Sequence, residues 1–293
     1  MTPASFTIGL IQAQALAGRE ENLERAGALV EQAAQRGAQV VCLQELFAGP
    51  YFCQTEDAAF FDLAEPIPGP CTRHMDEVAK RTGTAIVVPV FERRASGVYH
   101  NSAAVLGPDG AILGVYRKMH IPDDPCFHEK FYFAPGDLGF RALDTPFGRI
   151  GVLICWDQWF PEAARLTAMQ GAAVLFYPTA IGWHPREKAA FGAEQREAWR
   201  LVQRGHAVAN GVYVAAVNRV GHEIPAAGGD GLEFFGASFV AGPMGELLAE
   251  AGQEEAVLVA RVDGERIEAV RRGWPFFRDR RIDAFGGLLQ RFG

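Results

Sequence analysis

The chain has 293 residues, and 28 basic residues against 35 acidic ones leave a net charge of −7. This balance argues against a nucleic acid or an anionic membrane as partner, and no segment is long and apolar enough to predict a membrane span. The first residues lack the basic and apolar regions of a signal peptide, so we expect a cytoplasmic protein. The five cysteines are irregularly spaced and form no C-x-x-C pair, which favours free thiols in a reducing compartment.

The first half of the chain predicts a strand, a helix and further strands. Residues 6–12 form a short apolar run that is typical of a buried strand. An amphipathic helix follows, because apolar residues recur at spacings of three and four at Leu23, Ala26, Leu29, Val30 and Ala33. Gly37 stands where a helix C-cap belongs, and a strand begins shortly after it at residues 40–43. Residues 107–110 (Gly-Pro-Asp-Gly) predict a hairpin turn before a strand at residues 112–117.

The second half repeats these features in the same order. Residues 149–155 resemble the first strand. A shorter helix follows, with its predicted apolar face at Ala163, Leu166 and Met169. Gly171 matches the glycine at the end of the first helix, and residues 242–245 (Gly-Pro-Met-Gly) match the first hairpin turn. Three matches in one order indicate an internal duplication.

Each half thus runs strand, helix, strand, helix and then an antiparallel meander. We predict an α/β fold with pseudo-twofold symmetry, in which two sheets pack face to face with helices outside: a four-layer α-β-β-α sandwich. No linker or break in composition divides the chain, so residues 1–293 are predicted to form a single domain. The aromatic and basic residues of about 272–293 predict a C-terminal tail that serves as an interface.

Three reactive side chains follow predicted strands, at the sheet edge where chemistry gathers in α/β folds. Cys155 ends one strand, and Pro161 after it is well placed to open a helix. A thiol at such a turn has backbone N–H groups and a helix dipole nearby, which favour the thiolate and can hold an oxyanion. Glu45 follows a strand in an apolar context, which suits a carboxylate that accepts a proton. Lys118 adds a fixed cation, so the set supplies nucleophile, base and oxyanion partner.

These residues lie in segments that resemble the motifs of the nitrilase superfamily, and the likeness covers nearly the whole chain. The glutamate motif is residues 43–47 (Leu-Gln-Glu-Leu-Phe), the lysine motif residues 116–122 (Tyr-Arg-Lys-Met-His-Ile-Pro) and the cysteine motif residues 151–157 (Gly-Val-Leu-Ile-Cys-Trp-Asp). The resemblance implies the sandwich fold, a Glu–Lys–Cys catalytic set, no metal or other cofactor, and a homo-oligomer. It also implies a second glutamate after the lysine, at the position that Glu129 occupies.

Within the superfamily, the chain most resembles enzymes that hydrolyse N-carbamoylputrescine. The supporting strings are residues 51–54, 129–133, 155–165, 176–182 and 277–281. Hydrolases of N-carbamoyl amino acids tend to carry arginines just after the motif aspartate to hold a carboxylate, whereas this chain has Gln158 and Trp159, which suits an amine instead. The resemblance therefore implies hydrolysis of N-carbamoylputrescine to putrescine, ammonia and carbon dioxide in polyamine synthesis.

The amine end of such a substrate requires a carboxylate partner. Plant members of the group carry Gly-Ser-Glu-Pro where this chain has residues 182–185 (Gly-Trp-His-Pro), so that acid is absent. Other acids lie nearby in sequence, one shortly after this segment and two in the loop after Lys118. The predicted substrate-binding residues are Asp123, Asp124, Trp183, His184 and Glu187. The backbone N–H of Trp156 is predicted to be the second oxyanion donor.

Several alternatives remain open. The same catalytic set fits another amidase or ureido hydrolase of the superfamily, and a sandwich without activity could serve as a binding module. A Cys–His pair like that of papain-like enzymes would use His120 or His128 as base. The histidines show no ligand spacing and the glycines no nucleotide-binding pattern, so we expect a small carbamoyl or amide substrate and no metal or other cofactor.

Overall fold

The computed structural model describes residues 3–292, and its first large sheet is built mainly from the first half of the chain. The strands of this sheet are β1 (Phe6–Gln12), β2 (Val40–Cys42), β3 (Ala85–Ala95), β4 (Val98–Leu106), β5 (Ile112–Arg117) and β15 (Ala256–Val262). They lie in the order β15-β1-β2-β3-β4-β5. One edge strand of this sheet, β15, therefore comes from the end of the second half.

The second large sheet belongs to the second half. Its strands are β6 (Ala142–Asp144), β7 (Arg149–Val152), β8 (Val174–Thr179), β10 (Tyr213–Asn218), β13 (Phe239–Ala241) and β14 (Leu247–Glu250). They lie in the order β14-β13-β10-β8-β7-β6. A small sheet of β9 (Gly182–Trp183), β11 (Val220–Glu223) and β12 (Leu232–Phe235) lies beside it, in the order β11-β12-β9.

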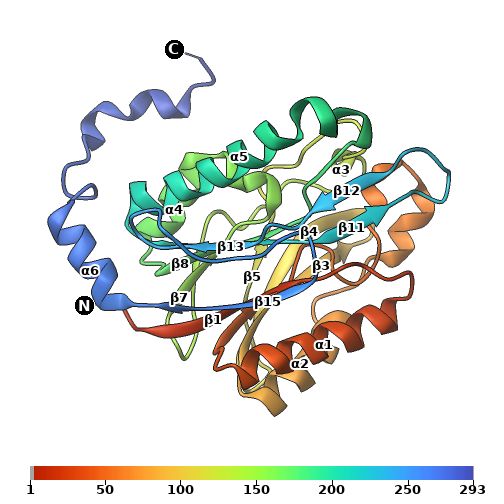
Figure 1. Cartoon of the computed structure of the whole chain (residues 1–293), viewed down its shortest axis with the longest axis horizontal. Coiled ribbons are helices and arrows are strands. Elements are labelled where there is room, and N and C mark those ends of the chain that lie inside the picture. Colours follow the sequence, from red (N-terminus) through yellow and green to blue (C-terminus); the bar gives the residue numbers. More distant parts are fainter. Residues whose placement is uncertain (1–2, 293) are drawn as a thin grey trace.

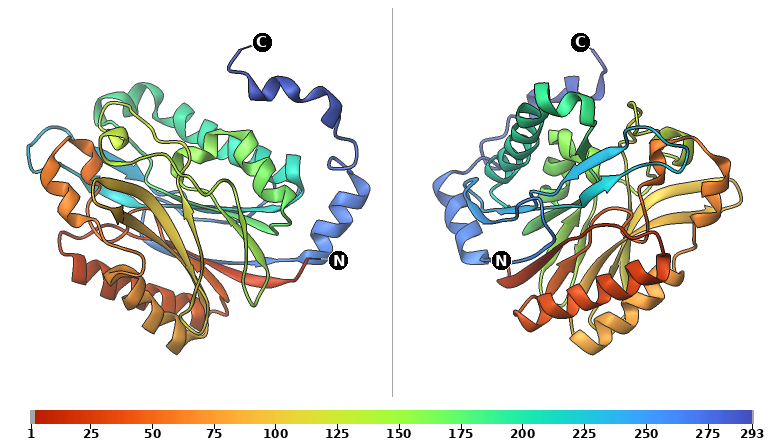
Figure 2. Two further views of the ribbon diagram at one scale, coloured as in Figure 1. Left: turned by 180° about the vertical axis from the view of Figure 1, so that it is seen from behind. Right: turned by 45° about the vertical axis from the view of Figure 1, so that its right-hand side comes forward.

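Helices cover the outer face of each large sheet, as Figures 1 and 2 show. The first sheet carries α1 (Arg19–Gln35) and α2 (Pro70–Thr82), and the second carries α4 (Pro161–Met169) and α5 (Pro185–Asn210). The remaining helices are α3 (Glu129–Tyr132) and α6 (Gly264–Gly273), with short 3-10 turns η1 (Phe52–Gln54), η2 (Ala58–Leu63), η3 (Cys155–Trp159), η4 (Ile282–Ala284) and η5 (Gly286–Leu289). The four layers are helix, sheet, sheet and helix, so the predicted sandwich is confirmed.

The predicted duplication is confirmed by the pairing of the strands. In the first sheet β1, β2 and β3 pair in parallel, and β4 and β5 continue antiparallel. In the second sheet β7, β8 and β10 pair in parallel, and β13 and β14 continue antiparallel. Gly37 and Gly171 follow α1 and α4 with φ of +90° and +92°, so the matched glycines adopt the same left-handed conformation.

The main core lies between the two sheets. It joins buried side chains of the first sheet, such as Ile8 and Val87, to those of the second, such as Val152 and Val214. A second cluster fills the space between the first sheet and its helices, with Val30 from α1 among its members. Because the core holds the two sheets face to face, segments that leave their strands at the same edge come close together.

The shorter helix α4 buries a different face from the predicted one. Leu166 and Met169 are 45% and 49% exposed, whereas Ala163 and Ala168 are buried, so the predicted face is wrong at two of its three positions. Small side chains allow a helix to lie close to a sheet, and a nine-residue helix is too short for spacing alone to define its buried face. Met169 instead contacts Arg280, whose Nη1 lies 3.1 Å from its sulfur.

The C-terminal residues after α6 leave the sandwich and run outside the α4–α5 layer (Figures 1 and 2). Trp274, Leu289 and Phe292 are 57%, 93% and 90% exposed. The predicted interface tail, about residues 272–293, therefore presents unburied apolar side chains, and its last residue lies outside the described part. No helix within residues 3–292 combines the length and hydropathy required to cross a membrane.

Candidate active site

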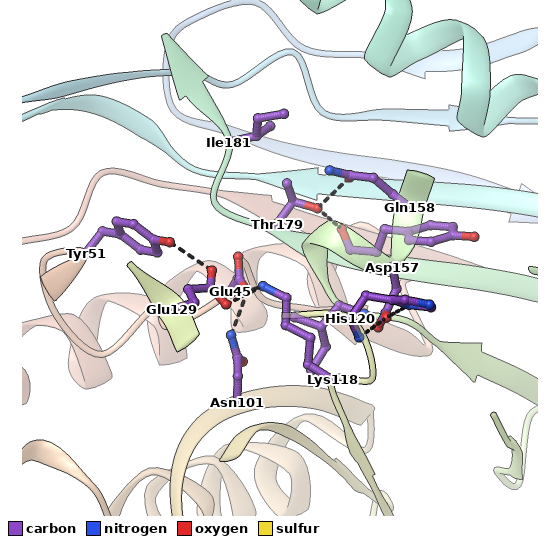
Figure 3. A network of polar contacts seen from close by, with 12 residues as sticks. Glu45, Tyr51, Asn101, Lys118, His120, Glu129, Asp157, Gln158, Thr179 and Ile181 are labelled. Atoms are coloured by element: carbon purple, nitrogen blue, oxygen red, sulfur yellow. Dashed lines mark hydrogen bonds and ion pairs between the residues drawn. The ribbon is translucent and has the colours of Figure 1, made fainter. Parts of the chain in front are cut away.

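The fold brings Glu45, Lys118 and Glu129 together at the edge where their strands end. Glu45 follows β2, Lys118 follows β5, and Glu129 begins α3. The Nζ atom of Lys118 lies 2.8 Å from Glu45 Oε1 and 2.6 Å from Glu129 Oε2. All three side chains are 0% exposed. Figure 3 shows the ammonium between the two carboxylates, so one buried cation is shared by two acids.

Neutral donors fix the orientation of each acid. Asn101 Nδ2 donates to Glu45 Oε1 at 2.7 Å, and the hydroxyl of Tyr51 donates to Glu129 Oε1 at 2.8 Å. The other oxygen of Glu45, Oε2, is buried and has no hydrogen-bond partner within residues 3–292. Lys118 and Asn101 thus hold one oxygen of this carboxylate and leave the other available as a proton acceptor.

Cys155 stands at a tight turn between β7 and α4. It is 5% exposed, and its φ of +43° lies in a region that residues other than glycine rarely adopt. It opens η3, and the first N–H groups of a helix, including that of Trp156, have no acceptor within the helix. Pro161 opens α4 as predicted. The turn therefore presents a thiol together with free backbone donors.

The charges of the site control its protonation. Burial, and then the negative charge of Glu45, raise the pKa of the Cys155 thiol well above its ordinary value. The expectation that this turn favours the thiolate is therefore wrong, since the resting thiol keeps its proton and requires a base. Burial opposes the charge of Lys118, but the adjacent Glu129 and Glu45 outweigh it and raise the pKa of the ammonium. Burial also raises the pKa of Glu129 to about 7, although Lys118 opposes the shift.

A buried aspartate connects the lysine segment to the cysteine turn. Asp157 Oδ2 accepts the hydroxyl of Tyr116 at 2.7 Å and the backbone N–H of Ile154 at 2.9 Å. Its Oδ1 lies 3.0 Å from the backbone nitrogen of His120 and 2.7 Å from the ring Nδ1 of the same residue. The ring of His120 also stacks on Phe160 at 3.6 Å between centroids. His120 thus belongs to the scaffold of the turn.

The Cys–His alternative is not supported by this geometry. The ring of His120 is directed at Asp157, as Figure 3 shows. His128 precedes α3, and its backbone N–H donates to Cys53 at 2.8 Å. Within residues 3–292, neither ring forms a hydrogen bond with Cys155, whereas the charge of Glu45 acts directly on its thiol.

A cavity of about 670 Å³ opens beside Cys155. Glu129, Trp156 and Gln158 line it together with Cys155. Three of the predicted substrate-binding residues also line it: Asp124, His184 and Glu187. Apolar side chains form much of the remaining wall: Phe127, Trp159, Ile181 and Phe235. The cavity thus combines the reactive thiol with apolar walls, three acids and one arginine, Arg186.

Two predicted substrate-binding residues lie outside the cavity wall. Trp183 is 4% exposed, its Nε1 donates to the carbonyl of Gly192 at 3.0 Å, and its ring packs on Phe235. A side chain engaged in this way supports the wall from behind, so its predicted contact with substrate is not found. Asp123 is exposed and is not part of the lining, in contrast to its neighbour Asp124.

Sequence reasoning missed several residues that shape the site. Tyr51, Asn101, Asp157 and Arg219 hold its acids or its loops by hydrogen bonds from distant parts of the chain. The sequence did not indicate these roles, because the contacts that define them join residues remote in sequence. The described residues 3–292 contain no group of three or more His, Cys, Asp or Glu side chains arranged to hold a metal ion.

The family model for carbon–nitrogen hydrolases matches residues 7–272 of this chain. The chain belongs to the carbon–nitrogen hydrolase family. It is 50% identical to an N-carbamoylputrescine amidase of Solanum lycopersicum, over 92% of this chain and 89% of the relative. The structure of a carbon–nitrogen hydrolase from Helicobacter pylori G27 superposes with a TM-score of 0.96 at 46% identity, covering 99% of this chain and 100% of the other.

A more distant structure connects the family to the predicted superfamily. Saccharomyces cerevisiae Nit3, a member of branch 10 of the nitrilase superfamily, has a TM-score of 0.76 at 26% identity, covering 95% of this chain and 97% of Nit3. The predicted superfamily and fold are thus confirmed, and so is the predicted reaction class, hydrolysis of carbon–nitrogen bonds other than peptide bonds.

Proposed function

We propose that this carbon–nitrogen hydrolase converts N-carbamoylputrescine into putrescine, ammonia and carbon dioxide. The observation that carries the proposal is the pair of acids in the cavity wall. Asp124 and Glu187 line the same cavity as Cys155, and neither forms a salt bridge with a basic side chain within residues 3–292. Two carboxylates without a salt-bridge partner among the described residues favour a substrate that carries a cation, because Arg186 of the same lining is already paired with Asp230.

The chemistry of this substrate matches the cavity along its length. N-carbamoylputrescine has a ureido group at one end, a chain of methylene groups and an ammonium at the other end. The ureido carbon would lie at Cys155, and the methylene chain would lie against apolar walls such as Phe127 and Ile181. The 50% identity to an N-carbamoylputrescine amidase supports the same substrate.

The geometry supports a covalent mechanism in two stages. Glu45 accepts the thiol proton on its free oxygen while the sulfur of Cys155 attacks the ureido carbon. Lys118 and the backbone N–H of Trp156 hold the resulting oxyanion, and preorganised donors of this kind contribute roughly 3–4 kcal/mol each. Glu45 then returns the proton to the leaving nitrogen, which departs as a neutral amine or ammonia. Glu129 keeps the ammonium of Lys118 in place.

The second stage releases the carbamoyl group from the sulfur. Water gives a proton to Glu45 and attacks the carbonyl carbon of the thiocarbamate, and the sulfur leaves and takes that proton from Glu45. The released carbamic acid decomposes to carbon dioxide and the remaining nitrogen base. Either order of nitrogen departure consumes one water and yields putrescine, ammonia and carbon dioxide, so the products do not depend on which nitrogen leaves first.

The decisive experiment is ammonia release from N-carbamoylputrescine without added metal, measured beside N-butylurea, N-carbamoyl-β-alanine and simple amides. We expect a strong preference for the first compound and its complete loss in Cys155→Ala. Activity on only the other compounds would support a different amidase or ureido hydrolase. Surviving turnover in Cys155→Ala would refute the nucleophile, and binding without turnover in the unmodified protein would indicate a binding module.

The proposal also includes the domain organisation, the cellular compartment and the oligomeric state of the enzyme. A single domain that comprises the whole chain agrees with a family match over residues 7–272. Five free cysteines suit the reducing cytoplasm, and the exposed apolar residues of the tail suit a homo-oligomer. Fractionation of the source cells tests the compartment, and the molar mass in solution tests the oligomeric state.

A further inference from the structure

One arginine of the second half lies buried against the loop that carries Glu45. Arg219 joins β10 to β11 and is 0% exposed. Its Nη2 donates to the backbone carbonyls of Glu45 at 3.0 Å, Leu46 at 2.8 Å and Gly49 at 3.3 Å. A planar guanidinium presents several donors in a fixed geometry, which a lysine does not. Arg219 therefore holds together the turn that follows Glu45.

The same guanidinium is paired with a carboxylate that reaches the other acid of the site. Arg219 Nη1 lies 2.8 Å from Glu223 Oε1, and Glu223 Oε2 accepts the backbone N–H of Tyr51 at 2.6 Å. The hydroxyl of Tyr51 in turn donates to Glu129 (Figure 3). The ion pair thus holds the loop at the backbone of Glu45 and at the backbone of Tyr51. Through these two contacts it helps to orient both carboxylates that contact Lys118.

The backbone held by this pair is strained. Leu46 has a φ of +49°, in the left-handed region that a branched side chain rarely adopts. Such a residue costs about 1–3 kcal/mol and persists only where its surroundings enforce it. A buried ion pair is often no more stabilising than apolar side chains of the same volume. The pair is therefore better explained by the geometry that it imposes than by stability.

We propose that Arg219 and Glu223 are positioning residues for Glu45. Through Tyr51, the same pair also sets the orientation of the second carboxylate. The inference rests on the proposed role of Glu45 as base. Because the pair comes from the second half of the chain, closing the sandwich places the base of the first half against the nucleophile of the second.

The test compares four variants with the wild type, including Glu223→Gln. Arg219→Lys keeps the charge but loses the fork of donors, and Glu45→Gln removes the charge of the base. Arg204→Met is the matched control, because Arg204 also donates to a backbone carbonyl, that of Gly245 at 2.8 Å, and neither residue lines the cavity. Two quantities are measured: kcat and KM for N-carbamoylputrescine, and the pH midpoint of Cys155 alkylation by iodoacetamide, followed by mass spectrometry of its peptide.

In Arg219→Lys we expect kcat to fall about 10- to 100-fold with a smaller change in KM, since a displacement of about 1 Å in a reacting group has such an effect. The alkylation midpoint should move to lower pH, as in Glu45→Gln, because the negative charge beside the thiol is removed or displaced. Arg204→Met should keep the wild-type kcat and midpoint. Glu223→Gln should also lower kcat and the alkylation midpoint, but by smaller amounts. It replaces Arg219→Lys in the test if that variant does not fold.

A fall in kcat with an unchanged midpoint would overturn the proposal, since the loss would then be general rather than a displacement of Glu45. Wild-type kcat and midpoint in the folded variants would overturn it as well. If the wild type releases no ammonia from N-carbamoylputrescine but the midpoint still moves in Arg219→Lys, the proposed substrate is wrong and the positioning role stands.

Discussion

At the scale of single residues, the site is a small set of buried charges that do not cancel. Glu45 and Glu129 share the one ammonium of Lys118, and all three are inaccessible to solvent. Burial, reinforced by this excess negative charge, explains why the Cys155 thiol keeps its proton and why one acid of the pair is readily protonated. The proposed base must therefore deprotonate the thiol only when a substrate offers the sulfur a carbon to attack.

The pH dependence of stability tests the charge of Glu129. Burial raises its pKa from 4.5 to about 7. Between these values the folded protein keeps a proton that the unfolded chain has released, so this carboxyl lowers the free energy of unfolding as pH rises, by about 3 kcal/mol at pH 7. Glu129→Gln should lack this slope. Urea unfolding at several values from pH 4.5 to 8 measures it, and parallel curves for the two proteins would contradict the prediction.

The acids of the cavity wall are expected to select a cationic substrate. Both Asp124 and Glu187 are exposed, so each contact with an ammonium contributes at most about 1 kcal/mol. Glu187→Gln and Asp124→Asn should therefore each raise KM for N-carbamoylputrescine about two- to fivefold and leave N-butylurea unaffected. Glu194→Gln on the same helix, which is exposed and outside the lining, should change neither value. Equal effects on both substrates would show that charge recognition is absent.

At the scale of elements, the site depends on contacts between segments that leave different strands. Asp157 in η3 bonds to Tyr116 in β5 and to His120 beyond it, so it aligns the exit of β5 with the turn of Cys155. Arg219, which is paired with Glu223, likewise aligns the loop after β2. Asp157 and Arg219 thus each connect the second half of the duplication to the first.

Asp157→Asn should disturb this alignment. The amide group would face the donors Tyr116 and Ile154, and an unsatisfied buried donor costs about 1–3 kcal/mol of stability. We expect a lower melting temperature and a kcat that falls more than KM changes, because Cys155 and Lys118 are no longer aligned. Asp144→Asn, which removes an exposed pair with Arg149, is the matched control and should leave kcat unchanged. A stable variant with normal kcat would rule out the aligning role.

At the scale of the whole molecule, the sandwich leaves two apolar features uncovered on the same side. Leu166 and Met169 are exposed on α4, and Leu289 and Phe292 are exposed in the tail. Exposed apolar side chains that gather on one side are typical of an interface between protein chains. The prediction that the tail joins copies of this chain agrees with this distribution.

Charged substitutions in the tail test this prediction. Leu289→Glu with Phe292→Glu should lower the molar mass in solution, as measured by light scattering after size exclusion, since two charges would be buried in the interface. The alkylation rate of Cys155 should stay within about twofold of wild type, because both positions lie outside the cavity wall. Arg291→Glu is the control for added charge. An unchanged molar mass would exclude the tail as the main interface.

The fold and the proposed catalytic set could be predicted from the amino-acid sequence alone. Repeated strands, matched glycines and turns encode the two halves locally, because each depends on neighbouring residues. Glu45, Lys118 and Cys155 could be selected since each follows a strand, and the sandwich places the ends of these strands together.

Other features depend on contacts between distant segments and are defined only once the chain is folded. The buried face of α4, the protonation of Cys155 and the place of Trp183 behind the cavity wall could not be predicted, because burial is a property of the packed chain. The roles of Asp157 and Arg219 were hidden for the same reason. Their partners lie up to 174 residues away, and a hydrogen bond across such a separation leaves no local pattern.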